Sequence, residues 1–142
     1  MIPRRIVEGF AVSPQIAPED LAALKDQGFA LVINNRPDGE EAGQPAAAEI
    51  EASAREAGIA YRAIPVAGGF SQAQVDEMAQ ALDGADGPVF AFCRTGTRST
   101  LLWSLAQASR GGDPDEIAAA AAAAGYDIAP VRAAVERLAA SS

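Results

Sequence analysis

Residues 88–103 read PVFAFCRTGTRSTLLW, an apolar run, a loop of small and basic residues, and a second apolar run in immediate succession. The first run is short and bounded by turn residues, which is typical of a buried strand, and the second continues as a helical pattern to residue 110. A loop that leaves such a strand lies at the carboxyl edge of a parallel sheet, where open α/β proteins bind ligands. This stretch therefore predicts a strand, a binding loop and a helix.

Two other apolar runs have strand character, and each of the three is preceded by a helical pattern. These strands are expected at residues 30–34 and 60–66. Strands that alternate with helices imply right-handed crossovers and a mostly parallel central sheet covered on both faces. The predicted fold is therefore α/β, with three α/β/α layers. Residues 4–9 and 10–13 are expected to add two short antiparallel strands at an edge.

The helical segments carry start and stop signals. Ser71 and Gln74 can form a capping box, and a glycine follows each of the first two segments. The expected helices span residues 18–27, 45–57, 71–82 and 99–110, with a further helix from Pro114 and a last one over about 127–138. A chain of 142 residues can bury a core without disulfides or metal, so residues 1–142 are expected to form a single domain.

The composition narrows the classes of function. A net charge of −8 disfavours binding to nucleic acid or to an anionic membrane. The first residues lack the pattern of a secretory leader, and no apolar run is long enough to span a membrane. One cysteine cannot form an internal disulfide. We therefore expect a cytoplasmic location. The absence of histidine excludes Ser-His-Asp and Cys-His catalysis.

The cysteine loop is suited to binding an anion. Backbone amides of residues 94–99 can point inward as a nest, and the following helix directs the positive end of its dipole to the same place. Together with Arg94 and Arg98, they would keep Cys93 as a thiolate at neutral pH, a nucleophile that needs no base. Gly96 permits positive φ and close approach of a ligand. The structural alternative is an inert buried thiol with solvated arginines.

The spacing of Cys93 and Arg98 resembles two families. Protein tyrosine and dual-specificity phosphatases place one more residue between the cysteine and the arginine. The shorter pattern at residues 93–99, Cys-Arg-x-Gly-x-Arg-Ser, resembles the active loop of rhodanese-type sulfurtransferases, whose tighter ring of amides suits a persulfide sulfur. Residues 10–45, followed by AYRAIPV and FCRTGTRS, are similar instead to the phosphatase-like domain of beta-lactamase-hydrolase-like proteins. This second resemblance covers residues 8–108.

The resemblance to that domain implies a protein-tyrosine-phosphatase-like fold. Its association with persulfide-oxidising metallohydrolase domains implies sulfide metabolism and a persulfide-dioxygenase-type partner. It also implies that Arg36, with Asn34 and Asn35, orients the cysteine loop or contacts the substrate. The segment that holds them, NNRPDGEE at residues 34–41, follows a strand and is expected on the same rim as the cysteine loop. The alternative is a plain turn at residues 37–39.

Two features depart from the phosphatase pattern. Dual-specificity phosphatases carry a general-acid aspartate on a loop before the cysteine, but residues 63–70, AIPVAGGF, contain no carboxylate. The histidine expected before the cysteine is replaced by Phe92. Five other ionisable side chains are candidates for the site: Asp38, Glu40, Asp76, Glu77 and Arg62. The alternatives are that Asp38 and Glu40 belong to a turn, that Asp76 and Glu77 lie on the solvated surface of a helix, and that Arg62 pairs with an acidic neighbour.

The expected catalytic residues are Cys93 and Arg98, and the expected substrate-binding residues are Arg94, Thr95, Gly96, Thr97, Ser99 and Arg36. The expected function is sulfur transfer: the Cys93 thiolate attacks the outer sulfur of thiosulfate or a persulfide, releases sulfite or a thiol, and passes the sulfur on to an external thiol acceptor. Neither a metal nor an organic cofactor is expected. The alternatives are a phosphatase that forms a phosphocysteine at Cys93 and a non-catalytic module that binds a small anion.

Overall fold

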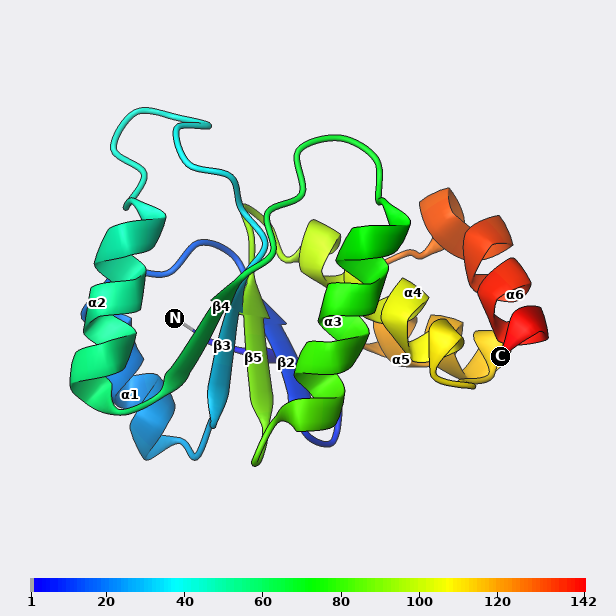
Figure 1. The fold of residues 1–142 in the computed structure, drawn as a ribbon, viewed down its shortest axis with the longest axis horizontal. Helices are drawn as coiled ribbons and strands as arrows, with labels where there is room; N and C mark the ends of the chain where they lie inside the picture. The colour runs from blue at the N-terminus through cyan, green and yellow to red at the C-terminus, as the bar shows by residue number, and fades with distance from the viewer. Residues whose placement is uncertain (1) are drawn as a thin grey trace.

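The computed structural model describes residues 2–142 and contains one five-stranded sheet (Figure 1). The strands are β1 (Arg4–Val7), β2 (Phe10–Ser13), β3 (Leu31–Asn34), β4 (Ala60–Ala63) and β5 (Val89–Phe92). Their order across the sheet is β1-β2-β5-β3-β4, and every neighbouring pair is parallel except β1 with β2. The prediction of an α/β fold with a mostly parallel sheet is confirmed.

The position of β2 differs from the prediction. The sequence predicts an antiparallel edge strand, but β2 lies inside the sheet, parallel to β5, and only β1 is antiparallel at the edge. All four residues of β2 are buried, which is the pattern of a strand covered on both faces. Because its partner β5 lies far along the chain, the short-range pattern around residues 10–13 contains no information about this pairing.

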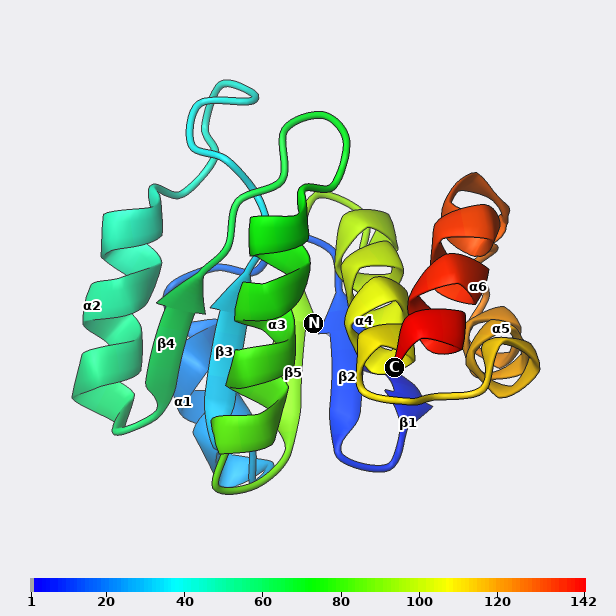
Figure 2. The same ribbon diagram turned by 45° about the vertical axis from the view of Figure 1, so that its right-hand side comes forward.

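Helices cover both faces of the sheet (Figure 2). They are α1 (Asp20–Asp26), α2 (Ala47–Ala57), α3 (Gln72–Gly84), α4 (Thr97–Ser109), α5 (Pro114–Ala123) and α6 (Arg132–Ser141). Phe90 and Phe92 of β5 point to the face covered by α1 and α2, whereas Val89 and Ala91 join the core beneath α3 and α4. The predicted three layers are therefore confirmed. Within residues 2–142, no helix combines the length and the apolar character that crossing a bilayer requires.

The helix that follows the cysteine loop, α4, lies between α3 and α6 and is largely buried. The ring of Trp103 stacks on Phe10 of β2 with 5.6 Å between ring centroids. The buried hydroxyl groups of Thr100 and Ser104 donate to the carbonyl oxygens of Gly96 and Thr100 at 2.9 and 2.8 Å, so these two hydroxyls are satisfied within the helix. The cysteine loop is therefore continuous with a helix that is packed into the core.

Most element boundaries differ from the predictions by a few residues, and three of the differences have a local cause. Helix α4 begins at Thr97 rather than at residue 99, because Gly96 rather than a later residue caps it. Strand β4 ends at Ala63, two residues before Pro65, which has no N–H for the ladder. Helix α6 begins at Arg132 because residues 129–131 form a separate 3-10 turn, whose first N–H donates to the carboxylate of Asp127 at 2.9 Å.

Candidate active site

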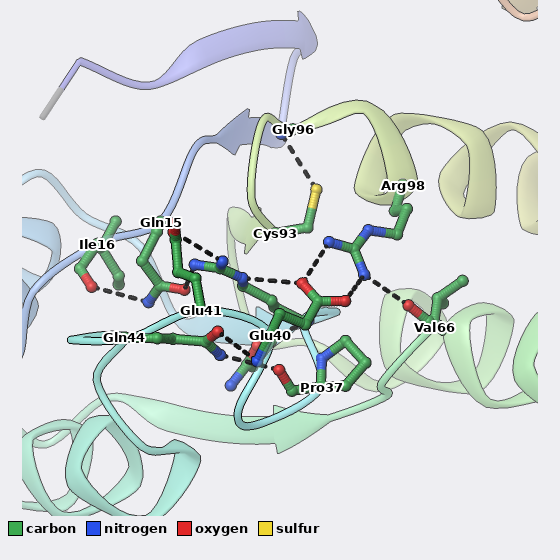
Figure 3. Close-up of polar contacts among 12 residues, drawn as sticks. Gln15, Ile16, Pro37, Glu40, Glu41, Gln44, Val66, Cys93, Gly96 and Arg98 are labelled. Atoms are coloured by element: carbon green, nitrogen blue, oxygen red, sulfur yellow. Dashed lines mark hydrogen bonds and ion pairs between the residues drawn. The ribbon is translucent and has the colours of Figure 1, made fainter. Parts of the chain in front are cut away.

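Four loops meet at the carboxyl edge of the parallel strands. The last residues of β2, β5, β3 and β4 are paired in register: Ser13 with Phe92, Phe92 with Asn34, and Asn34 with Ala63. The loops that follow these strands therefore leave the sheet side by side, and Figure 3 shows their side chains converging. The prediction that the segment at residues 34–41 shares a rim with the cysteine loop agrees with this pairing.

Cys93 is the first residue after β5 and the thiol at the centre of this cluster. It has no exposed surface, and its Sγ accepts a hydrogen bond from the backbone N–H of Gly96 at 3.1 Å (Figure 3). Gly96 is the N-cap residue of α4, with a φ of 90°, so the N–H that contacts the sulfur lies at the N-terminus of the helix. The Gly96 N–H and the N-terminal end of α4 thus both lie against the sulfur. The sulfur therefore lies in an environment suited to a nucleophile.

Arg98 brings the guanidinium group of the site. Its Nη1 donates to Oε2 of Glu40 at 2.8 Å and to the carbonyl oxygen of Val66 at 2.7 Å, and its Nη2 donates to Oε1 of Glu40 at 2.8 Å (Figure 3). The hydrogen bonds to Glu40 are the main cause that raises the pKa of Arg98; burial opposes the shift, and the nearby Cys93 sulfur adds to it. Arg98 is therefore a fixed cation close to both the carboxylate and the sulfur.

Arg36 lies behind Glu40 and has little freedom to contact a ligand. Its side chain is 1% exposed, and its Nε, Nη1 and Nη2 donate to Glu40, Gln15 and Glu41 at 3.0, 3.0 and 2.9 Å. Burial opposes its charge, but the two carboxylates outweigh this effect and raise its pKa. Its contacts place Arg36 where it orients Glu40, and direct contact with substrate stays a prediction.

The remaining candidate residues of the cysteine loop are exposed to solvent, except Ser99. Arg94, Thr95 and Thr97 are exposed, and the Thr95 hydroxyl donates to that of Thr97 at 3.0 Å. Arg94 is near enough to the Glu41 carboxylate to help Arg36 lower the pKa of that group. Ser99 is buried, and its hydroxyl has no partner among residues 2–142. Because buried polar groups are normally paired, the Ser99 hydroxyl has unused hydrogen-bonding capacity, and its contact with a substrate stays a prediction.

Of the carboxylates and the arginine considered from the sequence, only Glu40 meets the cysteine loop. Asp38 accepts the first backbone N–H of α2, that of Ala47, at 2.8 Å. Asp76 accepts from Gln72 on the exposed surface of α3, and exposed Arg62 donates to a backbone carbonyl of α3 at 3.3 Å. The contributions of Gln15 and Val66 were not predictable from motifs, although both follow a parallel strand.

The acid stability of the fold should depend on Glu40. Hydrogen bonds from Arg98, and then from Arg36, lower the pKa of Glu40 from 4.5 to about 2 against the opposing effect of burial. A carboxyl group with a lowered folded-state pKa stabilises the fold fully above its unfolded pKa and loses that contribution as the pH falls through its folded pKa. We expect the free energy of unfolding to fall by about 1–2 kcal/mol as Glu40 is protonated between about pH 4.5 and about pH 2. The loss is limited to this size because solvent screens the ion pair at the 26% exposed Glu40 side chain.

Urea unfolding of the parent and of Glu40→Gln across this pH range tests the expectation. The variant should be less stable at neutral pH and should show a flatter dependence of stability on acid. Glu56→Gln removes an exposed carboxylate on α2 and should keep the slope of the parent. Equal slopes for Glu40→Gln and the parent would contradict the assigned ion pair.

Comparison with known proteins identifies the family. The family model described as "Beta-lactamase hydrolase-like protein, phosphatase-like domain" matches residues 3–110. The chain belongs to this family. The predicted resemblance is thereby confirmed, and the match contains the whole cysteine loop.

Relatives of this phosphatase-like domain extend the comparison. The Beta-lactamase hydrolase-like protein of Agrobacterium fabrum is 41% identical over 108 residues, which are 75% of this chain and 25% of that protein. The chain thus spans about a quarter of the length of that curated relative. A structure described as a candidate phosphatase from Neisseria meningitidis is 34% identical, with a TM-score of 0.80 over 94% of this chain and 96% of that one.

The fold of the phosphatase-like domain also occurs in more distant structures. PTPMT1 superimposes with a TM-score of 0.75 over 99% of this chain and 98% of its own, at 14% sequence identity. At that identity the likeness concerns the fold alone. It confirms the predicted protein-tyrosine-phosphatase-like fold. The family description reads phosphatase-like and the description of the Neisseria meningitidis structure names a phosphatase, which favours the phosphatase alternative over sulfur transfer.

Proposed function

We propose that this chain is a cysteine-dependent phosphatase that hydrolyses a phosphate monoester through a phosphocysteine at Cys93. The observation that carries the proposal is the convergence of the Cys93 sulfur, the Gly96 amide and the Arg98 guanidinium at the carboxyl edge of the sheet, in a phosphatase-like family. The proposed unit of activity is a single domain over residues 1–142.

The proposed reaction has two steps. The Cys93 thiolate attacks phosphorus, so that an S–P bond forms while the ester P–O bond breaks; the leaving oxygen departs with the bonding electron pair and is then protonated by water. Water then attacks the phosphocysteine, which releases phosphate and regenerates the thiol. Arg98 stabilises the charge on the transferring group as a planar two-donor fork. Loop amides and the hydroxyls of Thr95, Thr97 and Ser99 complete the anion site, with Arg94 at its exposed rim.

The substrate class follows from the carboxylates near the site. Residues 63–70 supply none, and Glu40 is ionised at neutral pH because its pKa is about 2. A group in that state accepts protons poorly and has none to donate. The favoured substrates are therefore esters with a good leaving group, such as aryl phosphates, whose leaving oxygen needs little protonation.

Sulfur transfer is the second candidate function, and two specific observations favour it. Cys93 and Arg98 are separated by residues 94–97 alone, one fewer than in the phosphatase signature, and the missing acid has no consequence when the leaving group is sulfite or a thiolate. In this reaction the Cys93 sulfur bonds to the outer sulfur of thiosulfate as the S–S bond to sulfite breaks. An external thiol then takes the outer sulfur, and a persulfide-dioxygenase-type protein is the proposed partner.

Parallel assays of the parent chain distinguish these functions. We expect phosphate release from an aryl phosphate, with little sulfite release from thiosulfate in the presence of a thiol acceptor. Sulfite release, and an intact mass that gains one sulfur atom, in the absence of phosphate release would overturn the phosphatase proposal and support sulfur transfer. A chain with neither activity, whose affinity for inorganic phosphate survives Cys93→Ser, would support the anion-binding module.

A further inference from the structure

A tyrosine from the C-terminal helical region contacts the cysteine loop. Tyr126 follows α5 and lies outside the residues matched by the family model. It is 8% exposed, and its hydroxyl donates a hydrogen bond to the backbone carbonyl of Thr95 at 3.1 Å. The two residues are separated by 31 positions in the sequence, so the contact arises from the packing of the α5–α6 region against the loop.

The carbonyl that Tyr126 holds belongs to the same peptide unit as the amide that contacts the thiol. The carbonyl of Thr95 and the N–H of Gly96 lie in one planar unit, and in a trans peptide they point in opposite directions. The N–H end donates to Cys93 Sγ at 3.1 Å, and the carbonyl end accepts from Tyr126 at 3.1 Å. One peptide plane therefore connects the phenol to the sulfur.

We propose that Tyr126 is a positioning residue, which holds the peptide between Thr95 and Gly96 with its N–H directed at Cys93 and so keeps the thiolate form available for reaction. The inference rests on the proposal that Cys93 reacts as a thiolate, and it applies equally to phosphoryl and sulfur transfer. A hydrogen bond to the carbonyl also polarises the peptide and strengthens the N–H as a donor.

The fit around Gly96 supports this role. A glycine has access to conformations that other residues avoid, so the peptide before it can rotate unless something restrains it. A side chain at residue 96 would overlap the hydroxyl oxygen of Tyr126, which shows how closely the phenol contacts this backbone. The Tyr126 ring is itself held by Arg4 of β1, whose Cζ lies 5.5 Å from the ring centroid.

The charges around the thiol are consistent with a neutral phenol that donates its proton in a hydrogen bond. Burial is the main cause that raises the pKa of Tyr126, and the Cys93 sulfur adds to it while Arg4 opposes it. Tyr126 is therefore protonated at neutral pH. Among the other charged groups, Arg98 from α4 lies near the cysteine with Glu40 paired to it, and the exposed Arg94 is the next residue of the loop. None of these is altered by removing the Tyr126 hydroxyl.

The test uses the ultraviolet absorbance of the thiolate during a pH titration of the full chain. The chain has one cysteine, so the difference between each protein and its own Cys93→Ser counterpart isolates the signal of that thiol. In Tyr126→Phe we expect the midpoint of the titration to move upward, with roughly three- to tenfold less thiolate at any pH below the midpoint. The ring and its contact with Arg4 are retained in this variant, so the fold should persist.

Tyr61→Phe is the matched control. It also removes one phenol hydroxyl, which in the parent accepts a hydrogen bond from Asn34 Nδ2 at 3.1 Å on β4 and β3. Its thiolate titration should coincide with that of the parent. A Tyr126→Phe titration that coincides with the parent overturns the proposal, even if turnover falls. Because no substrate is present, the outcome is independent of whether the chain is a phosphatase.

Discussion

Cys93→Ser should lower turnover by about a thousandfold or more, because a serine hydroxyl is not ionised at neutral pH and the proposed reaction has no separate base. The chain contains neither histidine nor a second cysteine that could substitute for it. The exchange of sulfur for oxygen is nearly isosteric, so the loop should retain its conformation. Rates of phosphate release and of sulfite release, measured for parent and variant, give the size of the loss for both candidate reactions.

Two controls accompany Cys93→Ser. The thermal unfolding midpoint and the affinity for inorganic phosphate should stay close to those of the parent, because the amide of Gly96 and the side chain of Arg98 remain in place. A variant that keeps a tenth or more of the parent's turnover would show that Cys93 is not the nucleophile. Both proposed reactions would then fail together.

Arg98→Lys should reduce kcat/KM by about a hundredfold while preserving the positive charge. Arginine presents two parallel donors, whereas the lysine ammonium is a single point charge that cannot form the paired bonds seen to the Glu40 carboxylate. A transferring phosphoryl group offers oxygen atoms in a similar arrangement. The kinetic parameters for an aryl phosphate measure the effect.

Arg110→Lys provides the matched control for this substitution. Arg110 caps the opposite end of α4, and its Nε pairs with Asp83 at 2.8 Å on the surface, away from the cysteine loop. Its replacement should leave kcat/KM within about twofold of the parent, since exposed ion pairs contribute little. If Arg98→Lys behaves like Arg110→Lys, the guanidinium geometry has no part in the reaction.

The hydrogen bonds between Arg98 and Glu40 would compete with a phosphate bound to Arg98. In the structure, the carboxylate of Glu40 accepts from both terminal nitrogens of Arg98. A phosphate must either share these donors or take them from Glu40. The acid titration of Glu40→Gln therefore measures what this ion pair contributes to stability, and the kinetics of Arg98→Lys measure what its cation contributes to the reaction.

The local sequence determined the central unit of this protein. Residues 88–103 encode a strand, a loop and a helix through apolar runs and a glycine, and these signals act over a few neighbouring residues. The contact between Cys93 and Gly96 lies within the same short loop, as does the proximity of Arg98. The succession of helices and strands was enough to predict the parallel sheet and the place of the cysteine loop at its carboxyl edge.

Only the tertiary structure decided which distant groups complete the site. Glu40 and Arg98 are 58 positions apart, and Tyr126 reaches Thr95 across 31 positions. The interior place of β2 depends likewise on its pairing with β5. Periodicity and capping signals describe forces between near neighbours in the chain, whereas these contacts depend on strand order and on the paths of separate loops, which are settled when the whole core packs together.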